Sequence, residues 1–299
     1  MIRATTIPAP ASADAPRAVR EVHYRIAQPA HGHFPGHHRS TRGQSGFEFR
    51  GHTSLLNAPD PRRLDLHASL RDPFNEAGNW LVRVYSQRLS IPVQVVADLS
   101  ASMGFDGVRR KLDVLADLTE SLAWSAWRTG DAFGFVGCDT TVRSDWLQPT
   151  TRARSVGGPL AQRLRALVPE GRSARGLLDA HRHLGRQRAL LFLVSDYHLP
   201  PDEIAALLES LSTHELVPVV LWDPLEFALG DRPGLAWLRD PETSQRRLVW
   251  WRRALHERWQ AHHLARREAL LALFRRRRLR PLFIEQGYDP EAVTRHFHS

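Results

Sequence analysis

Cysteine and lysine are almost absent from this 299-residue sequence, and long hydrophobic runs are missing altogether. Its single cysteine, Cys138, has no partner for an internal disulfide, which fits a reducing compartment. No apolar run approaches the roughly 18 residues that a membrane-spanning helix needs. The first 30 residues contain no continuous apolar segment of the secretory type. We therefore expect a cytoplasmic protein that meets membranes only through its partners.

Arginine supplies nearly all of the positive charge, because 41 residues are basic and Lys111 is the only lysine among them. The formal net charge is +9. Such an excess favours an acidic partner, which can be a nucleic acid, an anionic membrane or an acidic protein face, and charge alone does not choose among these. Hydrophobic residues make up 42% of the chain. This ordinary content excludes a wholly disordered or collagen-like protein.

Composition divides the chain into three parts. Residues 1–45 are rich in Pro, Ala, Gly, Ser and His without apolar periodicity, so we expect a flexible arm. Four histidines between His31 and His38 could chelate a transition metal, but no fixed scaffold holds them, and a solvated tail is the preferred interpretation. Residues 46–84 are polar with short apolar patches, and we expect them to pack on the domain formed by residues 85–299.

Apolar strands alternate with amphipathic helices through most of this last part. The pattern is typical of an α/β fold, with a doubly wound, mostly parallel sheet and helices on both faces. A hairpin insertion is expected near residues 234–250. We predict strands at 91–97, 132–138, 141–147, 188–194, 216–222 and 282–284, and helices at 108–127, 160–167, 174–184, 201–211, 252–277 and 290–297.

Hydroxyl and carboxylate side chains stand together at the ends of two predicted strands. Asp98, Ser100 and Ser102 alternate just after the first strand, and Asp196 follows the most apolar one. Between them along the chain, Ser173 lies in a polar loop that enters a helix. Ligands of open parallel sheets bind outside the carboxyl ends of the strands. We therefore expect these five side chains to converge on one point.

Oxygen ligands of this kind suit a hard divalent cation, Mg²⁺ first and Mn²⁺ or Ca²⁺ as alternatives. Two carboxylates and three hydroxyls leave a coordination position for an outside carboxylate, which is a chemistry of recognition. The competing interpretation is that Ser and Asp are common helix caps, in which case one short motif binds no metal. The combination favours a metal site formed by Asp98, Ser100, Ser102, Ser173 and Asp196.

The Asp-x-Ser-x-Ser motif at residues 98–102 resembles the first motif of the metal-ion-dependent adhesion site in von Willebrand factor A domains. Asp196 matches the aspartate of the later motif, although Tyr197 follows it where the family usually has Gly. Ser173 falls where the family most often has Thr. The resemblance covers roughly residues 85 to 299 and implies a divalent cation held by these residues.

The preceding segment resembles the MoxR-associated family of bacterial A-domain proteins. Arg63-Leu-Asp65-Leu-His67 is similar to that family's Arg-x-Ile-Asp-Trp-type motif, with Leu66 where Trp is usual, and Asp240-Pro-Glu-Thr before a basic helix also agrees. Members of this type, the MxaS-like proteins of methanol-dehydrogenase gene clusters among them, occur beside MoxR-type ATPases. The resemblance implies an adaptor that works with a MoxR-type AAA+ ATPase in maturation or assembly of a client protein, with metal or cofactor insertion of the methanol-dehydrogenase type as one such role.

An enzyme is a weaker alternative. Ser195, Asp196 and His198 lie on one loop, whereas catalytic triads assemble from separate elements, and the sequence has neither a Gly-x-Ser-x-Gly elbow nor a P-loop. We expect no catalytic activity.

An Arg-rich nucleic-acid-binding A-domain protein is the other alternative, because arginines and tryptophans interleave across residues 250–278. A solvated helix face is the preferred interpretation of this segment, followed by a surface for an acidic protein, and nucleic acid comes last. The candidate partner-binding residues are Arg252, Arg253, Arg275, Arg276, Arg277 and Arg278.

Overall fold

A six-stranded sheet forms the centre of the protein, in the order β12-β9-β8-β5-β6-β7. The computed structural model describes residues 21–25, 35–39, 48–71, 80–86, 88–227, 234–239, 246–251 and 253–298. Neighbouring strands of the sheet are parallel except for β6 and β7. The doubly wound, mostly parallel α/β fold is therefore confirmed. The strands are β5 (Pro92–Asp98), β6 (Ala132–Cys138), β7 (Val142–Thr151), β8 (Leu190–Ser195), β9 (Glu215–Leu221) and β12 (Leu282–Ile284).

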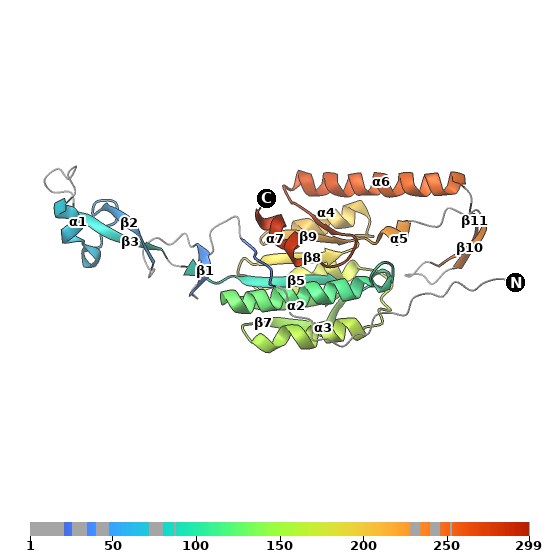
Figure 1. Cartoon of the computed structure of the whole chain (residues 1–299), viewed down its shortest axis with the longest axis horizontal. Helices are drawn as coiled ribbons and strands as arrows, with labels where there is room; N and C mark the ends of the chain where they lie inside the picture. The colour runs from blue at the N-terminus through green and yellow to red at the C-terminus, as the bar shows by residue number, and fades with distance from the viewer. Residues whose placement is uncertain are drawn as a thin grey trace.

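Helices cover both faces of this sheet (Figure 1). The apolar side chains of β5 and β8 are buried because each face of the sheet meets a helical layer. One layer contains α2 (Lys111–Thr129), α3 (Gly157–Ala166) and α7 (Pro290–His298). The opposite layer contains the 3-10 helix η4 (Arg175–His183), α4 (Pro201–Ser210) and α6 (Arg253–Arg276).

Helix α2 begins three residues later than its apolar spacing predicts. Arg110 has an extended backbone conformation, and Val108 lies outside the helix with 52% of its surface exposed. The Val108 amide instead donates to the carboxylate of Asp223 (2.7 Å). The helix ends at Gly130, whose φ of 72° is a left-handed conformation that glycine adopts without steric cost. Lys111 is therefore the first residue of α2 and not a residue of its second turn.

Helix α6 is the basic helix expected from the sequence, and it lies on the outer surface of its layer. Leu270 and Phe274 are its buried residues. They pack against the apolar cluster under α4, and most of the remaining length is exposed or half-buried. A short helix, α5 (Pro224–Phe227), follows β9. The antiparallel strands β10 (Gly234–Arg239) and β11 (Arg246–Trp251) precede α6.

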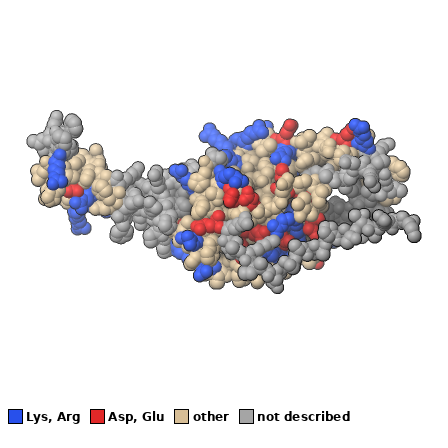
Figure 2. Space-filling view, viewed as in Figure 1, with Lys and Arg blue, Asp and Glu red and all other residues tan. Residues whose placement is uncertain are grey.

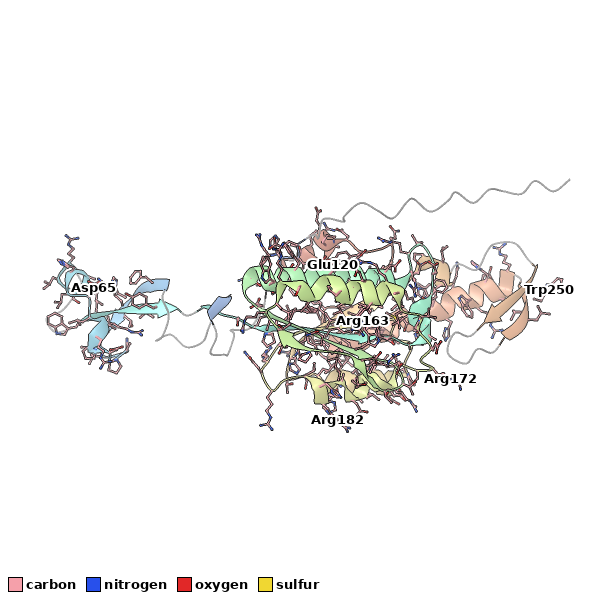
Figure 3. The ribbon with its side chains drawn as sticks, turned by 90° about the horizontal axis from the view of Figure 1, so that it is seen from below. Asp65, Glu120, Arg163, Arg172, Arg182 and Trp250 are labelled. Carbon is pink, nitrogen blue, oxygen red and sulfur yellow. The ribbon has the colours of Figure 1, made fainter. Side chains whose placement is uncertain are left out.

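A small antiparallel unit lies at one end of the molecule (Figures 1 and 3). Strands β2 (Glu48–Ser54) and β3 (Leu81–Ser86) pair there beside η1 (Pro61–Arg63) and α1 (Leu66–Arg71). Asp65, labelled in Figure 3, accepts hydrogen bonds from the Ala68 amide (3.0 Å) and from Arg83 Nε (2.7 Å). Asp65, the aspartate of the Arg63–His67 motif, thus caps the start of α1 and links this helix to β3.

Part of the segment expected to be a flexible arm packs on the sheet domain. The Val22 side chain is 1% exposed within the core cluster, and its amide donates to Ser125 Oγ on α2 (2.8 Å). The Tyr24 hydroxyl donates to Asp131 Oδ2 (2.7 Å). Residues 35–39 form β1 (Pro35–Arg39), which pairs with β4 (Arg88–Leu89). Burial of Val22 explains why Glu21–Arg25 is held in place without any sequence periodicity.

Several features expected from the sequence lie outside the described residues. These are His31 and His33 of the histidine-rich stretch, residues 240–243 of the resemblance to MoxR-associated proteins, and Arg252. No helix in the described ranges combines the length and the apolar character needed to cross a membrane. The remaining short elements are η2 (Ala101–Gly104), which follows β5 closely, and η3 (Arg154–Val156), whose Arg154 packs on Trp124 and Trp127 of α2.

Candidate functional site

The site lies where β5 and β8 end side by side. These strands are parallel neighbours, with Ala97 of β5 aligned to Val194 of β8, so the residues that follow meet at the same edge. The Ser195 hydroxyl donates to Asp98 Oδ2 (2.7 Å). The Ser100 amide donates to Asp98 Oδ1 (2.9 Å). Both oxygens of the Asp98 carboxylate are thus oriented by the protein.

Ser100 and Ser102 present their hydroxyls next to this carboxylate. Their Oγ atoms lie 3.1 Å apart, and both side chains are buried. Ser102 is also close enough to Asp196, which is buried just after β8, to act to lower the pKa of that carboxyl. The structure therefore brings together Asp98, Ser100, Ser102 and Asp196, four of the five side chains that the sequence pattern grouped.

The fifth residue, Ser173, belongs to a loop that lies against this group. The Ala101 amide donates to the Gly171 carbonyl (2.8 Å), and Ser100 and Gly171 form a parallel bridge. At the other end of the loop, the Gly176 amide donates to the Asp139 carbonyl (2.8 Å). Ser173 itself is half-buried. Its loop is thus fixed beside the site at both ends, while its ligand role stays a prediction.

Two buried carboxylates in close proximity repel each other. Burial, followed by the charge of Asp196, raises the pKa of Asp98 to about 6. A divalent cation between the two carboxylates would relieve this repulsion, and the adjacent serine hydroxyls are hard oxygen donors that Mg²⁺ accepts. The donor set on the Asp98 side therefore fits the expected cation.

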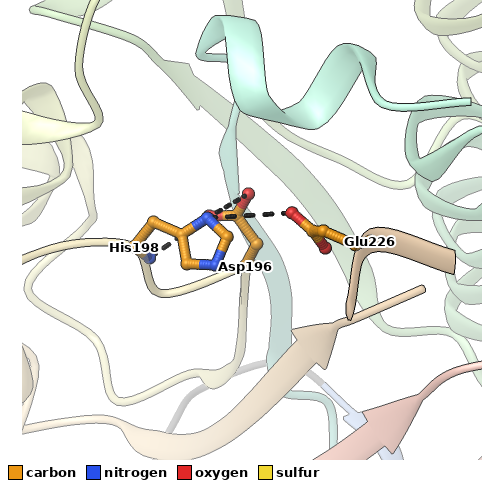
Figure 4. A group of neighbouring side chains, drawn as sticks. All are labelled: Asp196, His198 and Glu226. Atoms are coloured by element: carbon orange, nitrogen blue, oxygen red, sulfur yellow. Dashed lines mark hydrogen bonds and ion pairs between the residues drawn. The ribbon is translucent and has the colours of Figure 1, made fainter. Parts of the chain in front are cut away.

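The Asp196 side is occupied by basic side chains that the sequence pattern did not include. Lys111 Nζ lies 3.0 Å from Asp196 Oδ2 and 3.0 Å from Glu226 Oε1 of α5. His198 Nδ1 lies 3.3 Å from Asp196 Oδ2 and 3.9 Å from Glu226 Oε1 (Figure 4). Lys111 and Glu226 come from elements far from Asp196 in the sequence. The one signal available was that Lys111 is the only lysine of the chain.

Mutual charge interactions oppose the effect of burial on the pKa values of Asp196, Lys111 and His198. Burial acts to raise the pKa of Asp196, but the charges of His198 and Lys111 outweigh it and hold the pKa well below its usual range. Burial likewise acts to lower the pKa values of Lys111 and His198. The nearby carboxylates, Asp196 foremost, reverse this and raise both. The two aspartates of the site thus differ, because cations of the protein compensate Asp196, whereas none among the described residues compensates Asp98.

Asp223 anchors the elements that carry Lys111 and Glu226. Its carboxylate accepts from the Val108 amide before α2 (2.7 Å) and from the Leu225 amide at the start of α5 (2.8 Å). Gly107 permits this approach, because a Cβ added there would lie 2.3 Å from the Asp223 carboxylate. The lysine and glutamate are therefore brought to Asp196 by a common support.

Asp196, His198 and Glu226 could themselves hold a metal, since one ligand atom from each lies within 4.8 Å of the others. In the structure, Lys111 Nζ already bonds to both carboxylates of this trio. An ion that used all three ligands would have to displace the ammonium. This trio is consequently a poorer cation site than the side of Asp98.

The arginines of the basic helix α6 and its end differ in their contacts and exposure. Arg277 bonds to Glu209 and to the Ala205 carbonyl of α4, so its guanidinium serves packing. Arg253 pairs with Glu257 (3.0 Å) and is largely exposed. Arg275, Arg276 and Arg278 are exposed. Figure 2 shows basic side chains gathered over the end of α6 away from β10 and β11.

Cys138 is a buried residue at the end of β6, and burial raises the pKa of its thiol. An unreactive core thiol follows from this environment. Asp139, which follows β6, and Asp145 of β7 form ion pairs with Arg143 (3.3 and 2.7 Å).

Comparisons with known proteins find similar sequences and similar structures. A family model described as "Protein of unknown function DUF58" matches residues 60–269. A protein of Paracoccus denitrificans named "Uncharacterized protein in moxR 3'region" is 40% identical over 107 residues, which cover 36% of this chain and 93% of that protein. Among solved structures, BatB from Bacteroides thetaiotaomicron aligns with a TM-score of 0.43 at 13% identity, covering 70% of this chain and 98% of BatB. An aerotolerance-related membrane protein from Bacteroides fragilis aligns with a TM-score of 0.41 at 14% identity, covering 70% and 99%.

Proposed function

The chain belongs to the DUF58 family, and from that premise we propose that it is a metal-dependent adaptor that binds a MoxR-type AAA+ ATPase. The observation that carries the metal part is the buried pair of carboxylates at the ends of β5 and β8, with two serine hydroxyls beside Asp98. The residues that would hold the cation are Asp98, Ser100, Ser102 and Asp196, with Ser173 from the adjoining loop.

Recognition is the chemistry that these residues support best. When bound, the cation would supply a positive charge that a carboxylate oxygen of another molecule can coordinate. The protein's own groups orient the ligands, because Ser195 and the Ser100 amide fix the Asp98 carboxylate. Catalysis would need a poised nucleophile and base in mutual reach. Ser195 instead uses its hydroxyl to bond Asp98 and to accept from the Tyr197 amide (2.9 Å), so we propose a non-enzymatic role.

The choice of partner is supported by the name of the Paracoccus relative, which places that protein's gene beside moxR. We extend this to the present chain as a proposal: the carboxylate that completes the site comes from the ATPase or from its client. The finer part of the proposal is an MxaS-like role in maturation of a client that receives a metal or cofactor.

The test is co-purification from cells that also produce the MoxR-type ATPase of the same organism. Wild-type protein should retain the ATPase in Mg²⁺ buffer and lose it in EDTA, while the Asp98→Ala variant should fail to retain it in either buffer. Circular dichroism of the variant serves as the control, because the site lies at the rim of the sheet and the fold should persist. Retention that is equal in all conditions would contradict a metal-dependent contact.

A further inference from the structure

We propose that Lys111 is a resident cation of the site, whose ammonium group neutralises Asp196 and weakens divalent-ion binding between Asp98 and Asp196 in the free protein. The proposal rests on the proposed function, since it concerns the same site. It adds a residue that sets the metal affinity and that belongs to neither of the metal-binding motifs. It also predicts a direction: removing the ammonium makes the metal bind more tightly.

The position of Lys111 carries two costs. Its side chain is only 2% exposed, and transfer of an ammonium group from water into a protein interior is unfavourable. It is also the first residue of α2, where the helix dipole disfavours positive charge. The carboxylates of Asp196 and Glu226, each 3.0 Å away, offset these costs. The Phe105 ring adds a contact at 5.8 Å from its centroid.

The presence of lysine instead of arginine at position 111 also supports the proposal. Arginine serves at every other basic position of the chain apart from histidines, and lysine occurs once, at this site. A guanidinium is a planar group with five donors in a fixed fork, whereas an ammonium is a compact point charge with three rotatable donors. Only the ammonium resembles a small cation in size and shape. The ammonium lies between two carboxylates, as a bound metal ion would.

The consequence for metal binding follows from the shared ligand. Asp196 Oδ2 accepts a hydrogen bond from Lys111 and forms an ion pair with His198. The same carboxylate is one of the two anionic ligands expected for the divalent ion. An ion held by Asp196 would lie within a few ångströms of the ammonium, in a buried region where screening by solvent is weak. Asp98 has no such cation beside it among the described residues, so the repulsion acts from the Asp196 side alone.

The experiment measures Mn²⁺ binding to the full chain by electron paramagnetic resonance, comparing wild type with Lys111→Met. Methionine keeps the approximate length of the side chain and removes its charge. We expect Mn²⁺ to bind Lys111→Met at least tenfold more tightly than wild type, and Lys111→Arg, which keeps the charge, to remain weak. Equal affinities of wild type and Lys111→Met, or no binding by either, would overturn the proposal.

A double variant locates the ion. Adding Asp98→Asn to Lys111→Met should abolish the gained affinity if the ion binds between Asp98 and Asp196. If the gain survives Asp98→Asn and disappears with Glu226→Gln, the ion occupies the Asp196–His198–Glu226 trio and the proposal is wrong.

A second measurement keeps the test decisive if Lys111→Met unfolds readily, since the variant removes the ammonium that bonds to the buried Asp196 and the half-buried Glu226. Its melting temperature should then rise more steeply with added MnCl₂ than that of wild type, and an equal rise would overturn the proposal. None of these measurements involves the ATPase. A failure of ATPase binding therefore contradicts the proposed function and leaves this result intact.

Discussion

The Lys111 ammonium and the Asp196 carboxylate lie 3.0 Å apart, with both side chains buried, and join the start of α2 to the end of β8. This contact divides the site into two unlike halves. On one side, no cation lies beside Asp98 in the part of the chain that the structure describes, and its neighbours are serine hydroxyls. On the other side, Asp196 is already compensated by Lys111 and His198. The proposed divalent ion would therefore be favoured by the first half and would compete with the protein's own charges in the second.

Replacing Asp98 by Asn should stabilise the metal-free protein. Burial and the charge of Asp196 oppose ionisation of Asp98, and asparagine keeps the shape while removing the charge. We expect the free energy of unfolding in EDTA at pH 8 to rise by about 1 kcal/mol, because part of the gain is offset by weaker hydrogen bonds. Urea denaturation with and without excess MgCl₂ checks this. Mg²⁺ should stabilise wild type and leave Asp98→Asn unchanged; a variant that is less stable in EDTA would contradict the repulsion.

Gly176 should be required for placing the loop of Ser173. A Cβ added there would lie 2.3 Å from the carbonyl carbon of Thr141, a backbone atom that cannot rotate away. We expect Gly176→Ala to lower the free energy of unfolding by about 2 kcal/mol. Gly185→Ala is the matched control, because nothing lies within 4 Å of its added Cβ. Equal stability of the two variants would show that the loop is not packed as described.

The sheet and its order of elements could be predicted because each strand and helix carries its own hydrophobic period. β8 is a continuous apolar run apart from its final serine, β5 is a valine-rich run interrupted by Gln94, and α2 repeats Leu112, Leu115 and Leu122 along one face. The Asp98–Ser102 half of the site was predictable for the same reason, since it follows a strand directly. Lys111 and Glu226 were not, because the contact depends on how Asp223 brings two loops together. The docking of Glu21–Arg25 has no periodic signal at all.

Removal of the Tyr24 hydroxyl should test that docking. Tyr24→Phe deletes the hydrogen bond to Asp131 but leaves that carboxylate its bond from the Ile91 amide (2.9 Å). The expected loss is about 1 kcal/mol of unfolding free energy. Val22→Ala, which removes buried apolar surface, should cost about 2 kcal/mol. Thermal and urea unfolding measure both changes. If neither variant is destabilised, the segment does not form part of the folded core.

The small β2–β3 unit should depend on ionised Asp65. Hydrogen bonds from Arg83, then from the Ala68 amide and His52, lower the pKa of Asp65 below its usual range. Its stabilising effect is therefore complete above the unfolded-state pKa of about 4 and is lost as the pH falls through the lower folded-state value. The Ala68 amide resonance, followed by NMR from pH 6 downwards, should titrate below pH 4. In Arg83→Met the midpoint should move upwards; an unchanged midpoint would contradict the assignment of Arg83 as the main cause.

The proposed divalent cation should mediate the contact with the MoxR-type ATPase. Isothermal titration calorimetry of the purified ATPase with wild type and with Asp98→Ala, each in Mg²⁺ and in EDTA, measures this dependence. We expect measurable affinity for wild type in Mg²⁺ and at least a tenfold loss in each of the other three conditions. Four equal affinities would contradict it and would leave the exposed arginines at the end of α6 as the docking surface.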